Sequence, residues 1–403
     1  MTNYLSFIRQ QWPLITFGFL SVFWGNIGQS FFLSWFGADI QRELSISASQ
    51  YGLYYAIGTL ASSAVVMTIG GVVDKYSPRL LITILAVCLG LACVLMAQVA
   101  SVFILCVTLF LLRLCGQGLL PHTAQTIMIR SFEQQRGKAI SLASSGVAVG
   151  EAILPTVIIA LIAWLGWRQS WYVFAASVVV LYLPLSYWLL AQNASQKMPS
   201  SKIVKEEASD ASGRKDVLMD WRFWLILPTS LAAPFLVTGV FIQQNFLLEQ
   251  KMWSSALLAS GFVAYGVSHW LSAMISGSLV DRFSAKSLLL YLPMPLLAAL
   301  VTLVVFDRAW SVFAFMGMFG VAIGALNTVI NAAWAEIYGT TAIGSIRAMM
   351  TSLMIFSTAA APWLFGLMIE QGWNDSQLFG VLAWGMLLVA LLNVPAYLSF
   401  NKR

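Results

Sequence analysis

The chain is a succession of long apolar runs separated by short polar segments. A helix needs about 20 mainly apolar residues to cross the roughly 30 Å hydrocarbon core of a bilayer. By this criterion the pattern predicts twelve membrane-spanning helices, at residues 12–38, 49–73, 79–99, 101–129, 138–163, 168–190, 221–248, 255–279, 286–306, 309–336, 345–369 and 376–398. Strands of a membrane barrel would alternate apolar and polar residues over about ten positions, which these runs do not. We therefore expect an all-α membrane protein.

The composition also indicates lipid as the solvent. Of the 403 residues, 59% are hydrophobic and 9% are charged, whereas average soluble domains carry about 25% charged residues. A cytosolic enzyme and a secreted domain are thereby excluded. The net charge of +6 does not indicate nucleic-acid binding, because the basic residues are dispersed and form no stripe. The spacing of the four cysteines fits no metal site, so we predict no metal and no cofactor.

Basic residues accumulate in alternate connecting segments. Seventeen of the 22 Lys and Arg residues fall on the side of the membrane that would hold both termini, and four fall on the other side. Cytoplasmic loops retain Lys and Arg, so we expect both termini in the cytoplasm and an even number of spans. The expected location is the inner (plasma) membrane of a bacterium.

One long polar stretch divides the chain. Residues 191–220 are rich in charge, Ser and Gly, and they separate six predicted spans from six. We therefore expect an N-terminal six-helix bundle at 1–190, a cytoplasmic linker at 191–220 and a C-terminal six-helix bundle at 221–403.

An internal repeat supports this division. The motif Gly70-Gly-Val-Val-Asp74-Lys75, followed by Arg79, recurs as Gly277-Ser-Leu-Val-Asp281-Arg282, followed by Lys286. The glycines, the acids and the trailing bases are all displaced by the same number of residues, as are Pro155 and Pro362. A parallel duplication of six helices predicts two pseudo-symmetric bundles with a substrate site between them.

These motifs carry a family resemblance. The repeated Gly-x-x-x-Asp-Lys/Arg pattern resembles the loop signature of the major facilitator superfamily. The segment Arg113-Leu-Cys-Gly-Gln-Gly-Leu-Leu-Pro121 and the segment Arg130-Ser-Phe-Glu-Gln-Gln-Arg136-Gly-Lys-Ala139 are similar to the branch of monocarboxylate transporters and oxalate/formate exchangers. Ala273 stands where carriers of that branch place an arginine.

The resemblance implies a gating role for the repeated motif. Asp74 and Asp281 would each meet the positive N-terminus of a helix in the other half and lock the cytoplasmic side. Four bases would supplement this lock with ion pairs: Lys75, Arg79, Arg282 and Lys286. The alternative interpretation is that these bases only hold their loops in the cytoplasm.

Few ionisable residues fall within the predicted spans, where each is energetically unfavourable. Arg113 is the clear intramembrane cation, and Gln117 lies one helical turn further on, so the two are candidates to bind a substrate's polar end. Burial penalises the ionised form of Glu151, which suits a reversible proton carrier; the alternative is a helix-contact residue. His269 lies on the face of Ala273 and is a candidate for substrate binding and proton coupling, or else an interhelical hydrogen-bonder.

Uncharged polar residues complete the candidate substrate site. Amides facing lipid would be unsatisfied, so those deep in apolar spans should face protein or a cavity. They are Asn26, Gln29, Gln243, Gln244, Asn245, Asn327 and Asn331. The alternative is that they join helices by hydrogen bonds. Trp24 and Trp334 also lie deep enough to contact a substrate.

Together the pattern and the resemblance predict a monomeric secondary active transporter. It would move a small polar organic solute, such as an organic acid, by alternating access, with protons as the coupling ion. The alternatives are an exchanger or exporter of an amphipathic or zwitterionic compound, or a non-transporting membrane sensor of the same fold. An enzyme is not expected, because two distant histidines and one embedded glutamate supply no nucleophile and base.

Overall fold

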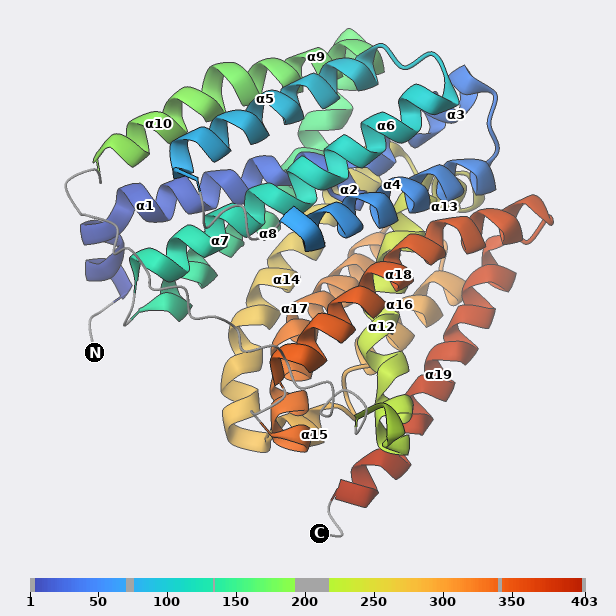
Figure 1. The fold of residues 1–403 in the computed structure, drawn as a ribbon. Helices are drawn as coiled ribbons and strands as arrows, with labels where there is room; N and C mark the ends of the chain where they lie inside the picture. The colour runs from blue at the N-terminus through green and yellow to red at the C-terminus, as the bar shows by residue number, and fades with distance from the viewer. Residues whose placement is uncertain (1–3, 70–75, 133–134, 193–216, 340–342, 401–403) are drawn as a thin grey trace. The chain divides into compact units, whose positions relative to one another are not determined.

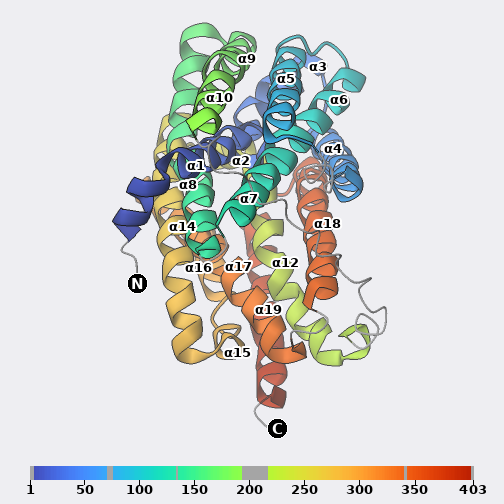
Figure 2. The same cartoon turned by 60° about the vertical axis from the view of Figure 1, so that its left-hand side comes forward.

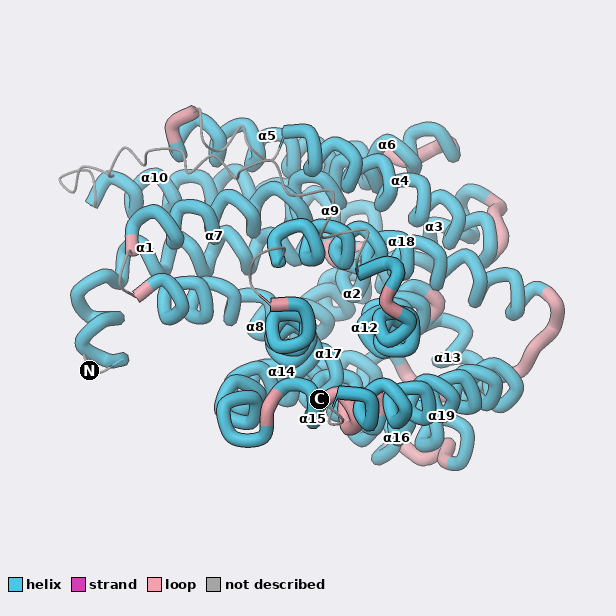
Figure 3. Tube along the Cα trace, turned by 60° about the horizontal axis from the view of Figure 1, so that its bottom comes forward, coloured by secondary structure: helices cyan, strands magenta, loops and turns pink. Residues whose placement is uncertain are grey.

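Helices make up the whole regular structure of the described residues. The computed structural model describes residues 4–69, 76–132, 135–192, 217–339 and 343–400, and no strand occurs among them (Figure 3). Ten helices of this part are long and apolar enough to cross a membrane. The prediction of an all-α membrane protein is confirmed.

The chain forms two compact units. The first comprises Met1–Ile46 and Tyr54–Val204, and the second comprises Ser47–Leu53 and Lys205–Arg403. Most of the predicted linker at 191–220 lies outside the described residues, as do Asp74 and Lys75 of the predicted gate.

The N-terminal unit contains the helices drawn from blue to green in Figure 1. They are α1 (Tyr4–Gly25), α2 (Ser30–Leu33), α3 (Gly37–Leu44), α4 (Ala48–Ile69), α5 (Pro78–Ala97), α6 (Val102–Leu112), α7 (Leu120–Ser131), α8 (Arg136–Leu165), α9 (Trp167–Ala176) and α10 (Leu183–Gln192). Two π-helical turns, Arg113–Leu119 and Ser177–Tyr182, join α6 to α7 and α9 to α10.

The C-terminal unit contains the helices drawn from yellow-green to red in Figure 2. They are α12 (Trp221–Ile242), α13 (Gln244–Lys251), α14 (Ser255–Phe283), α15 (Ala285–Leu288), α16 (Met294–Val305), α17 (Trp310–Tyr338), α18 (Ile343–Glu370) and α19 (Asp375–Phe400). Asp220 caps α12 by accepting a hydrogen bond from the Arg222 amide. Burial opposes its ionisation, but hydrogen bonds from Arg222 hold the pKa of Asp220 below its ordinary value.

The first predicted span is not the continuous helix that we expected over 12–38. The helix begins at Tyr4, gives way to a short 3-10 turn at Asn26–Gly28, and has extended backbone at Gln29 (φ −80°, ψ 154°). Close packing accounts for the break. A Cβ atom on Gly28 would lie 2.1 Å from the carbonyl oxygen of Leu112, so only glycine permits this approach.

The spans predicted at 221–248 and 286–306 are likewise interrupted. The seventh span stops at Gln243, which has non-helical backbone, and resumes as α13. In the ninth span the α-helix is interrupted between α15 and α16, where Pro293 disfavours helical geometry in the residue that precedes it.

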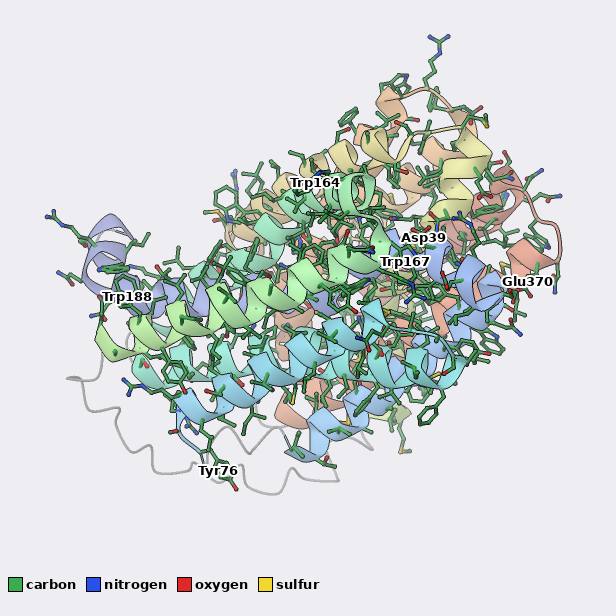
Figure 4. All side chains as sticks on the ribbon, turned by 90° about the horizontal axis from the view of Figure 1, so that it is seen from above. Asp39, Tyr76, Trp164, Trp167, Trp188 and Glu370 are labelled. Carbon is green, nitrogen blue, oxygen red and sulfur yellow. The ribbon has the colours of Figure 1, made fainter. Side chains whose placement is uncertain are left out.

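Aromatic side chains mark both ends of the N-terminal unit. Figure 4 labels Trp188 and Trp167 at opposite ends of the helix formed by α9 and α10. The Trp188 ring lies 5.7 Å from that of Trp12, and both side chains are exposed. Exposed tryptophans at helix ends are typical of membrane–water interfaces.

Candidate functional site

The N-terminal unit buries an arginine that has no acidic partner. Arg113 is 3% exposed and opens the π-helical turn that follows α6. Its guanidinium Nη1 donates to the carbonyl oxygen of Gly28 at 3.3 Å, and the guanidinium carbon Cζ lies 4.9 Å from the centroid of the Tyr55 ring. Among the described residues it forms no ion pair, and its Nε is buried without a hydrogen-bond partner. Such an arginine has donors available for a bound anion.

The break in the first span supplies the rest of this site. Gly28 ends the 3-10 turn that interrupts this span, just before the extended residue Gln29, and its carbonyl oxygen accepts the hydrogen bond from Arg113. Asn26 is 1% exposed; its Nδ2 donates to the carbonyl oxygen of Gly146 at 3.0 Å, and its Oδ1 has no hydrogen-bond partner. Gln29 and Gln117 are half-buried on the two segments that meet here.

Glu151 lies next to this break on α8. Its neighbour Gly150 makes room for Asn26, since a Cβ atom on Gly150 would lie 1.9 Å from the Asn26 amide nitrogen. Glu151 itself is 5% exposed and interacts with other groups.

A polar stripe on α4 was not anticipated from the sequence. Tyr51, Tyr55, Thr59 and Ser62 are all buried, at 0%, 0%, 2% and 5% exposure. Their spacing of three or four residues places them on one face of the helix. That spacing is visible in the sequence and could have identified Tyr55 as a residue of a polar helix face.

The C-terminal unit holds a polar cavity of about 220 Å³ between α12, α17 and α18. Two of the predicted amides, Asn327 and Asn331, line it together with Ser230, Trp334 and Thr351. Asn331 Nδ2 donates to the carbonyl oxygen of Asn327 at 2.7 Å, so both residues are held on one face of α17.

Arg347 also lines this cavity, which the sequence did not reveal. Its side chain is exposed and forms no ion pair with any residue that the structure describes. The indole nitrogen of Trp334 is buried without a hydrogen-bond partner. The cavity therefore presents a cation, amides and an aromatic ring, a combination suited to a small polar solute.

The three amides of the seventh span differ in their surroundings. Gln243 Nε2 donates to the carbonyl oxygens of Ala48 and Pro362, each at 2.9 Å, so this residue joins helices. Gln244 is 1% exposed and has other interactions. Asn245 is half-buried, and its Nδ2 has no hydrogen-bond partner among the described residues.

His269 is half-buried on α14 and does not line the polar cavity. Its ring centroid lies 6.0 Å from that of Tyr265, in an edge-to-face arrangement. Its roles in substrate binding and proton coupling stay predictions.

The described gate residues are at the surface. Arg79, Asp281 and Arg282 are exposed, and Lys286 is half-buried. Glu336 organises the turn that carries Lys286, because its carboxylate accepts from Ser284 Oγ at 3.0 Å, from the Ala285 amide at 2.8 Å and from the Lys286 amide at 3.2 Å. No metal-binding cluster of His, Cys, Asp or Glu occurs in the part of the chain that is described.

Two all-helical units with polar and charged groups buried in apolar helices define an integral membrane protein. The pattern of the Major Facilitator Superfamily matches residues 15–261, which is more than half of the chain. The chain therefore belongs to this superfamily.

Two relatives by sequence are named as probable transporters. A probable sulfoacetate transporter of Cupriavidus necator is 27% identical over 175 residues, or 43% of this chain and 40% of the relative. A probable L-galactonate transporter of Escherichia coli is 22% identical over 191 residues, or 45% of this chain and 41% of the relative. The chain thus matches less than half the length of either relative.

Solved structures share the fold over nearly the whole chain. A bacterial homologue of the human lysosomal transporter Spinster, inward-facing and unoccupied, has a TM-score of 0.66 at 14% identity and covers 99% of this chain and 95% of its own. The nucleoside transporter NupG has a TM-score of 0.72 at 12% identity, with 96% and 98% covered. These likenesses concern the fold alone, and with the superfamily match they confirm the predicted twelve-helix architecture.

Proposed function

We propose that the protein is a secondary active transporter of small organic anions that works by alternating access and is coupled to protons. The observation that carries this proposal is Arg113, a buried guanidinium with a free donor and no acidic partner among the described residues.

An isolated charge in a membrane domain needs a compensating interaction. A charged residue at the centre of a span is unfavourable by about 2.5–3.5 kcal/mol on insertion scales. The Gly28 carbonyl and the Tyr55 ring offset part of this through their partial negative charges. An anionic substrate would complete the compensation, because the planar guanidinium matches a carboxylate or a sulfonate with two parallel hydrogen bonds.

The relatives support the same chemical class. Sulfoacetate and L-galactonate, the compounds for which the two sequence relatives are named, are both small organic anions that carry a carboxylate. The polar cavity of the C-terminal unit adds a second cation, Arg347, and the amides Asn327 and Asn331, which suit hydroxyl or further anionic groups of such a solute.

Counterflow in proteoliposomes tests the proposal. Vesicles loaded with unlabelled sulfoacetate or L-galactonate should accumulate the labelled compound, and a neutral nucleoside should not exchange. Arg113→Gln should lower the initial exchange rate at least tenfold, because the neutral amide cannot pair with the anion. Arg308→Gln is the matched control, since Arg308 is an exposed arginine that lies outside both polar sites.

Two results would contradict the proposal. If the wild-type protein exchanges no organic anion, the substrate class is wrong. If Arg113→Gln has the unfolding temperature of the wild-type protein and also its rate of substrate exchange, Arg113 does not bind the substrate. Arg113→Lys keeps the charge and should retain part of the exchange, which separates loss of charge from loss of folding.

A further inference from the structure

A long apolar groove runs along the outside of the C-terminal unit. It has a volume of about 370 Å³ and is formed by α14, by α15 with the residues that lead into α16, and by α17. Several of its apolar side chains are exposed, among them Leu271 (44%), Ile275 (54%) and Tyr291 (66%). The groove does not include the cavity residues Asn327, Asn331 or Arg347.

Two of the hydroxyl groups in the groove are already engaged in hydrogen bonds. Ser272 Oγ donates to the carbonyl oxygen of Val321 at 2.8 Å, and Ser276 Oγ donates to the carbonyl oxygen of Ser272 at 2.6 Å. These hydroxyl hydrogens are therefore not available to a polar solute. What remains facing outward is mainly hydrocarbon, which suits an apolar chain.

The dimensions of the groove match one leaflet of a bilayer. On α14 it extends from Ser268 to Leu279. At a rise of about 1.5 Å per residue this is roughly 16 Å. Half of the hydrocarbon core of a bilayer measures about 15 Å.

A cation lies at one end of this groove. The lining residues of α14 follow a helical stripe, and Arg282 continues that stripe, because it lies seven residues, or about two turns, after Ile275. Arg282 is exposed, stacks on the adjacent Phe283 ring at 5.1 Å and forms no ion pair with a described residue. Asp281 lies about 100° around the helix from Arg282 and so falls off the stripe.

We infer that this groove binds an anionic phospholipid of the surrounding bilayer, with one acyl chain along α14 and the phosphate on Arg282. The cation lies at the end of the apolar groove, just as the phosphate of a phospholipid lies at the end of its acyl chains. A guanidinium also pairs with a phosphate through two hydrogen bonds. Tyr291, an exposed aromatic residue of the lining, is of the kind that is enriched at the headgroup level. Neither the substrate nor the transport activity enters this inference.

Native mass spectrometry of the purified full chain tests it. The protein is incubated with phosphatidylglycerol, which is anionic, or with phosphatidylcholine of the same acyl chains, which is zwitterionic. We expect the apparent dissociation constant of the first phosphatidylglycerol molecule to be at least tenfold lower than that of phosphatidylcholine. Arg282→Gln should reduce this preference at least fivefold, because the phosphate loses its partner.

A pair of variants on one helix tests the groove itself. Ile275→Trp would fill the groove and should abolish retention of the tightly bound lipid. Val263→Trp is the control, because Val263 is similarly exposed on α14 (45%) but lies on the opposite face, outside the groove. Both variants place the same side chain at a surface position, so a general loss of folding would affect both and would show as a lower unfolding temperature.

Three outcomes would overturn the inference. The first is equal retention of the two lipids by the wild-type protein. The second is unchanged retention in both Arg282→Gln and Ile275→Trp. The third is a dimer mass that disappears in Ile275→Trp, which would assign the groove to a second copy of this chain.

Discussion

A single buried lysine connects three segments at one end of the C-terminal unit. Lys251 is 5% exposed, and its ammonium forms ion pairs with Asp307 and, at 2.8 Å, with Asp375. The two partners differ in environment, because the Asp375 side chain is 16% exposed and that of Asp307 is 75% exposed. Only the Lys251–Asp375 pair is therefore shielded from water.

This asymmetry makes a prediction about stability. Lys251→Met should lower the free energy of unfolding by about 3–5 kcal/mol, because it leaves the shielded Asp375 carboxylate without a partner. Asp307→Asn should lower it by about 1 kcal/mol or less, since exposed ion pairs contribute little. Denaturant unfolding of the purified protein measures both values. Equal losses in the two variants would show that Lys251 is not held chiefly by Asp375.

The sequence is least informative about the burial of individual charged side chains. In the sequence, Lys251 and Arg347 contribute only to the count of basic residues that sets the topology, yet one is buried in an ion-pair cluster and the other lines a cavity. A count of charges locates the ends of spans but carries no information on which side chains later meet. Arg113 could be identified because it lies within an apolar run, where a charged side chain is energetically unfavourable.

At the scale of elements, the sequence predicted that spans exist but not where they break. Hydropathy is averaged over a whole span, and both spans stay apolar on average although they contain Asn26 and Gln243. The breaks arise from contacts with other helices, namely Gly28 against Leu112 and the Gln243 amide with Ala48 and Pro362. The candidate site at Arg113 depends on the first of these breaks, so its geometry could not be derived from the chain alone.

The first turns of α4 are fastened to α18 by Glu370, labelled in Figure 4. Its carboxylate accepts from the Ser49 amide at 2.9 Å and from Ser49 Oγ at 2.7 Å, and it thereby caps the start of α4. Ser47–Leu53 accordingly belongs to the C-terminal unit, whereas α4 from Tyr54 onward belongs to the N-terminal unit. This one helix is shared by the two units.

Weakening this cap should release the shared segment. In Glu370→Gln one carboxylate oxygen becomes an amide donor that cannot accept from Ser49, and a hydrogen bond to a charged group contributes about 1.5–3 kcal/mol. Amides in peptides covering 47–53 should therefore exchange with deuterium roughly tenfold faster or more. Glu249→Gln, at an exposed carboxylate of α13, should leave that exchange unchanged. If these amides exchange at the wild-type rate in Glu370→Gln, packing alone holds the segment.

At the scale of the whole molecule, the repeat in the sequence predicts two halves, and the structure contains two compact units. The predicted halves end near the linker at 191–220, and the compact units change over at Val204 and Lys205. Each unit places a cation at its candidate site, Arg113 in the first and Arg347 in the second. In the proposed transport cycle each unit thus has a cation available to a substrate, whereas the sequence alone indicated only Arg113.

Proton coupling is a property of the whole cycle, and Glu151 is the buried carboxyl on which we expect it to depend. Net uptake driven by a pH gradient requires a group that takes up a proton on one side and releases it on the other. Exchange of one substrate molecule for another requires no net proton movement. The same variant can therefore separate coupling from binding.

Glu151→Gln should retain counterflow within about twofold but lower uptake driven by a pH gradient at least tenfold, because an amide does not titrate near neutral pH. Labelled organic anion in proteoliposomes, with and without an imposed gradient, measures both activities. His269→Gln is the informative comparison, since His269 is the other titratable candidate. If His269→Gln loses gradient-driven uptake while Glu151→Gln keeps it, the proton is carried on α14, and Glu151 serves only to pack α8 against its neighbours.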